Sequence, residues 1–257
     1  MSGPTIVMLA GEGESTNIIY NSLKEEFAIE RVIIEEPVPK SQFLKRRVKK
    51  LGLVKVFGQV LFQVTVVPYL RKSSRARIQE IKESWKLDAA PIDESKVTHV
   101  ESVNSDETVA VLQKLRPEIV IINGTRIVST RILNCVPAKF INMHAGITPL
   151  YRGVHGAYWA LVENNREACG VTVHFVDPGI DTGGILQQEI ISPIKTDNFV
   201  TYPLLQLAAG IPLLKRVLRE LSENQAETRP APEGRSKLWS HPTLSEYIWY
   251  RIRRGIS

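Results

Sequence analysis

The sequence has little cysteine, and this shortage bears on the compartment and on the kinds of site to expect. Cys135 and Cys169 are the two cysteines among 257 residues. They are too few for a disulfide framework, so we expect a reducing, cytoplasmic environment. No cluster of cysteine and histidine has the spacing of a metal site, and we expect no metal. The first residues lack a basic segment followed by a long apolar run, so we expect no signal peptide.

Acidic residues are absent from residues 40–78, which contain eleven lysines and arginines. The remainder of the chain holds 22 basic and 27 acidic residues, so this segment carries the whole excess behind the net charge of +6. A concentrated basic segment can meet phosphate, an anionic membrane or nucleic acid, and its simplest alternative is a solvated helix face. Few aromatic side chains are interleaved with these cations, so we expect no nucleic-acid partner.

Apolar residues within about 40–80 recur at helical spacing, so the basic segment predicts helices inserted into the chain. Ser41 is a candidate helix start, and Pro68 is a predicted stop or kink. The apolar stretch is short and interrupted for a membrane span. Packing against a partner or over the sheet is the simplest interpretation of the insert, and peripheral contact with an anionic membrane is the alternative.

Short apolar runs alternate with helical patterns over the rest of the chain. Residues 5–10 form a run that looks buried, and a Gly-rich turn, a helical pattern and a second run at 31–36 follow. This order predicts an α/β fold, Rossmann-like and doubly wound, with a mostly parallel sheet. Further strands are predicted at 97–103, 118–124, 140–144, 170–179 and 183–194. Residues 170–179 alternate cleanly, which predicts one face toward a core.

We divide the chain into a main domain, 1–195, which contains the helical insert, and a C-terminal extension, 196–257. The extension is predicted to hold a helix over 197–222, followed by a polar, proline-containing linker and a basic, aromatic tail. That tail offers a surface that a second copy could meet, so a homodimer is one expectation.

Three side chains that can carry chemistry fall at or just past predicted strand ends, where open α/β sheets bind ligands. They are Asn142, His144 and Asp181. An imidazole can take the proton of an attacking amine, an amide can hold a developing oxyanion, and a carboxylate can orient the imidazole. Asn142 and His144 are two residues apart and therefore point to one side of a strand. His174 alternates with Val173, and we expect a structural role for it.

Two stretches together resemble a known family. "NMHAGITPLYRG" and "GVTVHFVDPGIDTGGILQQEIISPI" are similar to the formyltransferases that use 10-formyltetrahydrofolate. That family includes glycinamide ribonucleotide transformylase, methionyl-tRNA formyltransferase, formyltetrahydrofolate hydrolase and the sugar N-formyltransferases. The resemblance covers about 117–194, is looser across 5–36, and is absent from 40–97 and from the C-terminal tail. It implies the formyltransferase fold.

The resemblance also implies roles for individual residues. Asn142, His144 and Asp181 match the catalytic trio, with His144 acting either as base or as oxyanion donor. 10-Formyltetrahydrofolate would be the formyl donor, bound as a cosubstrate. The alternative for Ile127 and Val128 is that they belong to the apolar core and do not contact the donor. The expected donor contacts are Arg126, Ile127, Val128, Val176 and Asp177.

The Gly-rich turn "GEGESTN" matches the place where glycinamide ribonucleotide transformylase holds the phosphate of its acceptor. Backbone N–H groups at a helix N-terminus suit an anion, although Glu12 and Glu14 add negative charge here. A plain strand–helix turn is the alternative. We expect Arg152-Gly153 to shape the acceptor side as well. The expected acceptor contacts are therefore Gly11, Gly13, Ser15, Arg152 and Gly153.

The acceptor is a small amine, expected to contain phosphate. We favour an amino sugar linked to a nucleotide or a carrier, because the insert and the tail are extra segments around the donor-binding core. Glycinamide ribonucleotide is the main alternative. Initiator tRNA is less favoured, because that enzyme normally has a further, β-rich domain. A non-catalytic folate-binding protein is the alternative from another class.

Overall fold

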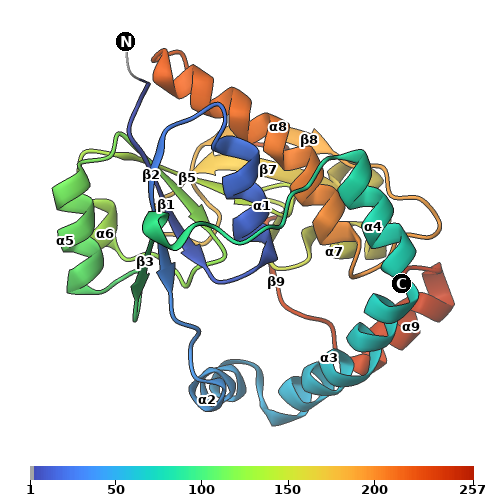
Figure 1. Ribbon diagram of the computed structural model, residues 1–257. Helices are drawn as coiled ribbons and strands as arrows, with labels where there is room; N and C mark the ends of the chain where they lie inside the picture. Colours follow the sequence, from blue (N-terminus) through green and yellow to red (C-terminus); the bar gives the residue numbers. More distant parts are fainter. Residues whose placement is uncertain (1–2) are drawn as a thin grey trace.

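The computed structural model describes residues 3–257, and Figure 1 shows a central sheet with helices on both faces. The strands are β1 Ile6–Gly11, β2 Ile29–Glu35, β3 Val97–Val100, β4 Ile119–Asn123, β5 Lys139–His144, β6 Tyr151–Gly153, β7 Gly170–Phe175, β8 Ile185–Ile190 and β9 Lys237–Trp239. The helices are α1 Glu14–Leu23, α2 Lys40–Leu51, α3 Leu53–Ser73, α4 Arg75–Ser84, α5 Asp106–Leu115, α6 Thr130–Leu133, α7 Gly156–Val162, α8 Tyr202–Ser222 and α9 Leu244–Arg254.

The main sheet has seven strands in the order β3-β2-β1-β4-β5-β7-β8. β1 to β5 run parallel, and β7 and β8 are antiparallel to their neighbours. The order reverses direction between β1 and β4, which is the switch point where doubly wound folds open a crevice. The prediction of an α/β, Rossmann-like, mostly parallel sheet is confirmed.

Two apolar cores lie on the two faces of this sheet. On one face, residues of α1 and α8 pack on alternate positions of β1, β2, β4 and β7, including Met8 and Leu214. On the other face, residues of α5 and α6 pack on the remaining positions, including Leu9 and Leu112. Strand alternation accounts for this division, because neighbouring side chains of one strand point to opposite faces. Helix α8 belongs to the first core although it follows residue 195.

A separate core joins the insert to the C-terminal tail. Phe62 of α3 is fully buried, with its ring 4.9 Å from that of Phe199 and 5.0 Å from that of Tyr247 in α9. Tyr158 of α7 joins the same cluster. The insert therefore packs on the rest of the protein through one face. In Figure 1, α3 and α9 lie side by side, away from the sheet.

Several local predictions need correction. The first inserted helix begins at Lys40, with Pro39 preceding it, so Ser41 is not its start. Pro68 neither stops nor divides α3, which continues to Ser73, because Val67 and Leu70 hold both sides of the proline in a buried core. By length and composition α3 is also sufficient to cross a membrane, contrary to our expectation.

β7 is the other element that departs from its prediction. Its residues from Gly170 to His174 are all buried, rather than alternating between core and solvent. The reason is that β7 lies inside the sheet between β5 and β8, with α8 on one face and the loop after β5 on the other.

Candidate active site

The three predicted catalytic residues lie together beside a cavity of about 430 Å³ at the carboxyl ends of β4 and β5. Asn142 and His144 come from β5, and Asp181 comes from the loop between β7 and β8. The other lining residues include Arg126, Ile127, Val128, His174, Val176 and Asp177.

His144 is held at both ring nitrogens. Its Nδ1 lies 3.4 Å from Oδ2 of Asp181, and its Nε2 lies 2.9 Å from the carbonyl oxygen of Tyr151. A carbonyl can only accept, so Nε2–H donates to Tyr151. In the neutral ring Nδ1 therefore carries the lone pair, and it faces the carboxylate of Asp181. Gly146 permits this geometry, because a Cβ there would lie 2.8 Å from Nε2 of His144.

Both the backbone and the side chain of Asp181 are held in a defined conformation. Its own φ is +53°, in the left-handed region that few residues other than glycine adopt. Its Oδ2 accepts a hydrogen bond of 2.9 Å from the N–H of Gly153. Strained backbone of this kind is found preferentially at functional sites. The carboxylate is therefore held in position before any ligand arrives.

His174 connects Asn142 to the same cluster, and its sequence position alone indicated only a structural role. Asn142 and His174 are partners in the antiparallel pairing of β5 with β7. Nδ1–H of His174 donates to the carbonyl of Phe175 at 2.6 Å, so its Nε2 accepts from Nδ2 of Asn142 at 3.3 Å. Burial lowers the pKa of His174, which keeps the ring neutral. One N–H of Asn142 is thereby used, and the other is left for a ligand.

The three predicted donor contacts on the segment after β4 line the cavity: Arg126, Ile127 and Val128. Ile127 is 60% exposed, so it does not belong to the core, whereas Val128 is buried. Glu35, at the end of β2, shapes this segment. Its side chain accepts a hydrogen bond of 2.6 Å from the N–H of Arg126 and forms an ion pair with the guanidinium of the same residue.

Val176 and Asp177 border the opposite side of the cavity. The N–H of Val176 donates to the carbonyl of Phe140, which continues the pairing of β5 with β7. Oδ1 of Asp177 accepts from the N–H of Gly179 at 3.0 Å and from the hydroxyl of Thr182 at 2.7 Å. Asp177 thus closes the loop that carries Asp181.

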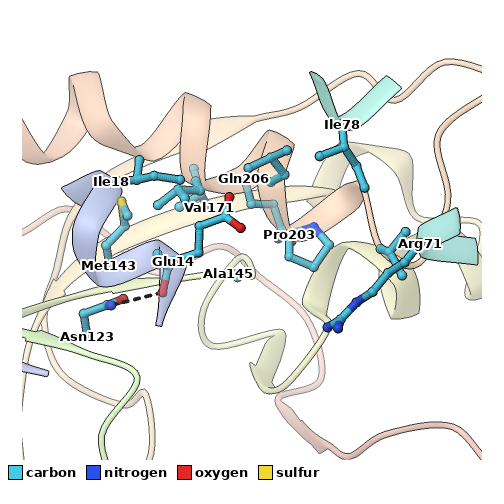
Figure 2. Close-up of a pocket in the computed structure, with 14 residues that line it drawn as sticks. Glu14, Ile18, Arg71, Ile78, Asn123, Met143, Ala145, Val171, Pro203 and Gln206 are labelled. Carbon is cyan, nitrogen blue, oxygen red and sulfur yellow. Dashed lines mark hydrogen bonds between the residues drawn. The ribbon is translucent and has the colours of Figure 1, made fainter. Parts of the chain in front are cut away.

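The Gly-rich turn lies beside a second cavity of about 650 Å³, which shares Met143 and Ala145 with the first. Figure 2 shows this cavity, with Asn123 at one end and Arg71 at the other. Asn123 donates to the hydroxyl of Ser15 at 3.2 Å. The remaining lining is mainly apolar and comes from α1, α4, α8 and β7 (Ile18, Ile78, Val171, Leu204 and Leu207).

The predicted acceptor contacts are divided between places. Ser15 lines the second cavity, whereas Gly11 borders a different hollow beside Arg126, and Gly13 caps α1. Gly153 lines the catalytic cavity. The guanidinium of Arg152 instead donates to Ser236 at 2.9 Å and to the carbonyl of Ile180 at 3.0 Å, which ties the Asp181 loop to the tail.

The described residues contain no evident set of side chains that could bind a metal ion. Among residues 3–257, no group of three or more histidine, cysteine, aspartate and glutamate side chains is arranged to hold an ion.

The family model for formyl transferases matches residues 43–203. The chain belongs to the formyl transferase family. The matched range extends into residues 43–97, where the sequence motifs showed no resemblance. Methionyl-tRNA formyltransferase from Pelotomaculum thermopropionicum is 31% identical over 149 residues, which cover 57% of this chain and 47% of that protein. The chain thus spans about half the length of the curated relatives it matches.

Solved structures of formyltransferases share the fold. A sugar N-formyltransferase from Shewanella sp. FDAARGOS_354 superimposes with a TM-score of 0.57 at 16% identity, covering 89% of this chain and 74% of that one. Glycinamide ribonucleotide transformylase 1 from Symbiobacterium toebii also gives a TM-score of 0.57, at 18% identity, covering 89% of this chain and 92% of that one. At these identities the likeness concerns the fold.

Two residues of this formyl transferase family member were missed as contributors to the site. His174 holds Asn142, and Glu35 holds Arg126. The signal for His174 is its antiparallel register with Asn142, which a single sequence does not reveal. The signal for Glu35 is an acidic residue at the end of an apolar strand, a place where burial without a partner would be costly.

Proposed function

We propose that this protein transfers a formyl group from 10-formyltetrahydrofolate to a primary amine of a small acceptor. The observation that carries the proposal is the cluster at one cavity: Asn142 and His144 on one side of β5, with Nδ1 of His144 3.4 Å from the carboxylate of Asp181. The favoured acceptor is an amino sugar linked to a nucleotide or a carrier. The family assignment supports the reaction class, and the choice of acceptor rests on the second cavity.

The residues around the 430 Å³ cavity fit a folate donor. Val128 lines this cavity, and within residues 3–257 its backbone N–H and C=O have no hydrogen-bond partner, so both can pair with a ligand. A fused heterocycle offers the complementary pair at its edge. Ile127 adds an exposed apolar side chain, and Val176 lies opposite. Bound here, the donor supplies the formyl carbon beside Asn142 and His144.

Asn142, His144 and Asp181 have different roles in the transfer. As the amine nitrogen bonds to the formyl carbon, the carbonyl oxygen becomes negative, and the free N–H of Asn142 donates to it. The amine loses a proton, which Nδ1 of His144 accepts while Asp181 stabilises the imidazolium. When the bond to the donor nitrogen breaks, His144 returns the proton to that nitrogen. The neutral ring, the amide product and the deformylated donor remain.

The second cavity supports a phosphate-containing acceptor with an apolar portion. It adjoins the first at Met143 and Ala145, so an amine placed at this junction reaches the cluster. Arg71 is the cationic side chain among its lining residues. The negative charge of Glu14 forms an ion pair with Lys82 of α4, which lowers the repulsion that the sequence suggested against an anion at this turn.

Two other acceptors are supported by particular likenesses. The structural match to glycinamide ribonucleotide transformylase covers 92% of that chain, which supports glycinamide ribonucleotide. The sequence matches to methionyl-tRNA formyltransferases support initiator tRNA. A non-catalytic folate-binding protein remains the alternative from another class, and the complete trio argues against it.

The test is a formyl-transfer assay with 10-formyltetrahydrofolate and a panel of amines: nucleotide-linked amino sugars, glycinamide ribonucleotide and aminoacylated initiator tRNA. Formylated product is identified by mass spectrometry, with His144→Ala as the inactive control and His99→Ala, an exposed histidine on β3, as the matched control. We expect turnover on an amino sugar. Product from another amine alone would replace the acceptor, and folate binding without any product would favour the binding protein.

A further inference from the structure

We infer that α3 and α9 form a surface that binds anionic lipid bilayers. This inference is independent of the proposed reaction and concerns the side of the molecule away from the sheet (Figure 1). We call this surface the α3–α9 face. It is defined by seven of the exposed apolar side chains of the two helices: Leu53, Val54, Phe57, Val64, Ile248, Trp249 and Ile252.

The apolar side chains of the α3–α9 face are unusually exposed. Val54 is 87% exposed and Ile252 is 76% exposed. Leu53, Phe57 and Val64 follow one another at spacings of four and seven residues, so they share one side of α3. Scattered exposed apolar residues are ordinary, but a contiguous set marks an interaction surface.

The two helices join into one surface at Gly58. A Cβ at Gly58 would lie 2.9 Å from Cβ of Thr243, the residue that caps α9, so the helices meet closely there. A groove of about 670 Å³ runs along the junction, lined by residues of both helices. Leu53, Phe57 and Ile248 all border it. The exposed apolar side chains of the tail therefore continue those of the insert.

Cations surround this surface, and acids are scarce around it. Lys55 borders the groove, and Lys49 and Lys50 immediately precede Leu51, which also borders it. Arg251, Arg253 and Arg254 flank Ile252 on α9. No acidic residue occurs between 40 and 78. The side chain of Glu246 in α9 is occupied by the cap of Thr243.

The combination of exposed apolar side chains and surrounding cations favours the surface of a bilayer over a second copy of the chain or a membrane span by α3. An apolar strip with an aromatic residue, bordered by lysine and arginine, is the pattern of helices that lie in the interface of anionic membranes. A second copy on a twofold axis would set the same cations against one another. A full span by α3 would withdraw Phe62 from its core and separate Gln59 from its partners, Arg47 and His241. The helix is therefore expected to lie on the bilayer.

The test is co-sedimentation of the full chain with vesicles of phosphatidylcholine alone or mixed with phosphatidylglycerol. We expect binding to the anionic vesicles, weakened by salt, and little binding to phosphatidylcholine alone. Val54→Asp/Ile252→Asp should weaken binding by at least about tenfold. Ile190→Asp, an exposed apolar residue on β8, is the matched control. Lys49→Glu/Lys50→Glu should also weaken binding by about tenfold or more, against Lys114→Glu/Lys139→Glu as control.

Several outcomes would overturn the inference. Absence of the wild-type chain from the anionic pellet would do so, as would equal sedimentation of the face variants and their controls. A wild-type dimer that the face variants break, without vesicle binding, would assign the surface to a second copy. Melting temperatures establish that each variant is folded. None of these variants touches the catalytic cavity, so loss of binding with intact formyl transfer separates this inference from the proposed reaction.

Discussion

The catalytic cavity and the α3–α9 face differ in which side chains they bury and which they expose. At the cavity, the polar groups of the cluster are partly or fully buried and bonded to one another or to the backbone: His144 to Tyr151 and Asp181, and Asn142 to His174. On the α3–α9 face, apolar side chains meet solvent and the surrounding cations are concentrated. The first arrangement holds the reactive groups in position, and the second leaves an exposed surface that can bind a partner.

The sharpest way to test this division is to remove the imidazole from the cavity. We expect His144→Ala to lower kcat/KM for formyl transfer by roughly 100- to 10,000-fold, because the amine proton loses its acceptor. Vesicle binding by the same variant should match the wild type. A loss of binding together with activity would show that the two regions are not independent.

Truncating the core that joins the two regions should affect stability most. Phe62 is fully buried between Phe199 and Tyr247, so Phe62→Ala is expected to lower the free energy of unfolding by about 3–5 kcal/mol. Val54→Ala, on the exposed side of the same helix, should change it by less than about 0.5 kcal/mol. Chemical denaturation measures both. Equal values would mean that α3 is not packed as described.

Acid should weaken the same junction through two partly buried histidines. Nε2 of His155 lies 3.1 Å from Nδ1 of His241. Burial lowers the pKa of His155 to about 3 and that of His241 to about 4, from an ordinary 6.5. The unfolded chain therefore binds protons below pH 6.5 that the folded chain does not, and stability falls as the pH falls.

The expected slope of this loss is up to about 1.4 kcal/mol per pH unit for each histidine between pH 6.5 and the lowered pKa values. Unfolding free energies measured from pH 7 to pH 5 test it. His155→Phe/His241→Phe should flatten the profile over this range. An unchanged slope in that variant would contradict the assignment.

The smallest expected effect concerns the residue that orients Asn142. His174→Phe keeps the ring volume but removes the nitrogen that accepts from Asn142, so we expect about a tenfold loss of kcat through misplacement of the amide. Because His174 also lines the cavity, the affinity for the donor is measured beside kcat. His99→Phe on β3 is the control. If His174→Phe kept full activity, Asn142 would be held by its strand alone.

The sequence allowed much of the fold and part of the site to be predicted. The order of apolar runs and helical patterns was sufficient for a parallel sheet, and a spacing of two placed Asn142 and His144 on one side of β5. The partnership of Asn142 with His174 was beyond reach, because it depends on the register of two strands whose paired residues are 32 apart. The contact of Glu35 with Arg126 joins residues 91 apart for a similar reason.

The α3–α9 face shows the same limit more strongly. α9 is amphipathic, whereas α3 is apolar around most of its circumference, and the insert was expected to meet either a membrane or the protein. The structure shows that one side of α3 packs and the other is exposed, and that the tail extends the exposed side. The contact between Phe62 and Tyr247 decides which side of α3 is buried. These residues are 185 positions apart, and no local pattern encodes their contact.

The independence of the catalytic cavity from the α3–α9 face can be measured in one assay of formyl transfer to a soluble amine, run on three proteins. These are the wild type, His144→Ala and Val54→Asp/Ile252→Asp. We expect the first and third to form product at the same rate and the second to form almost none. Full activity in His144→Ala, or a matching loss in the α3–α9 variant, would contradict this expectation.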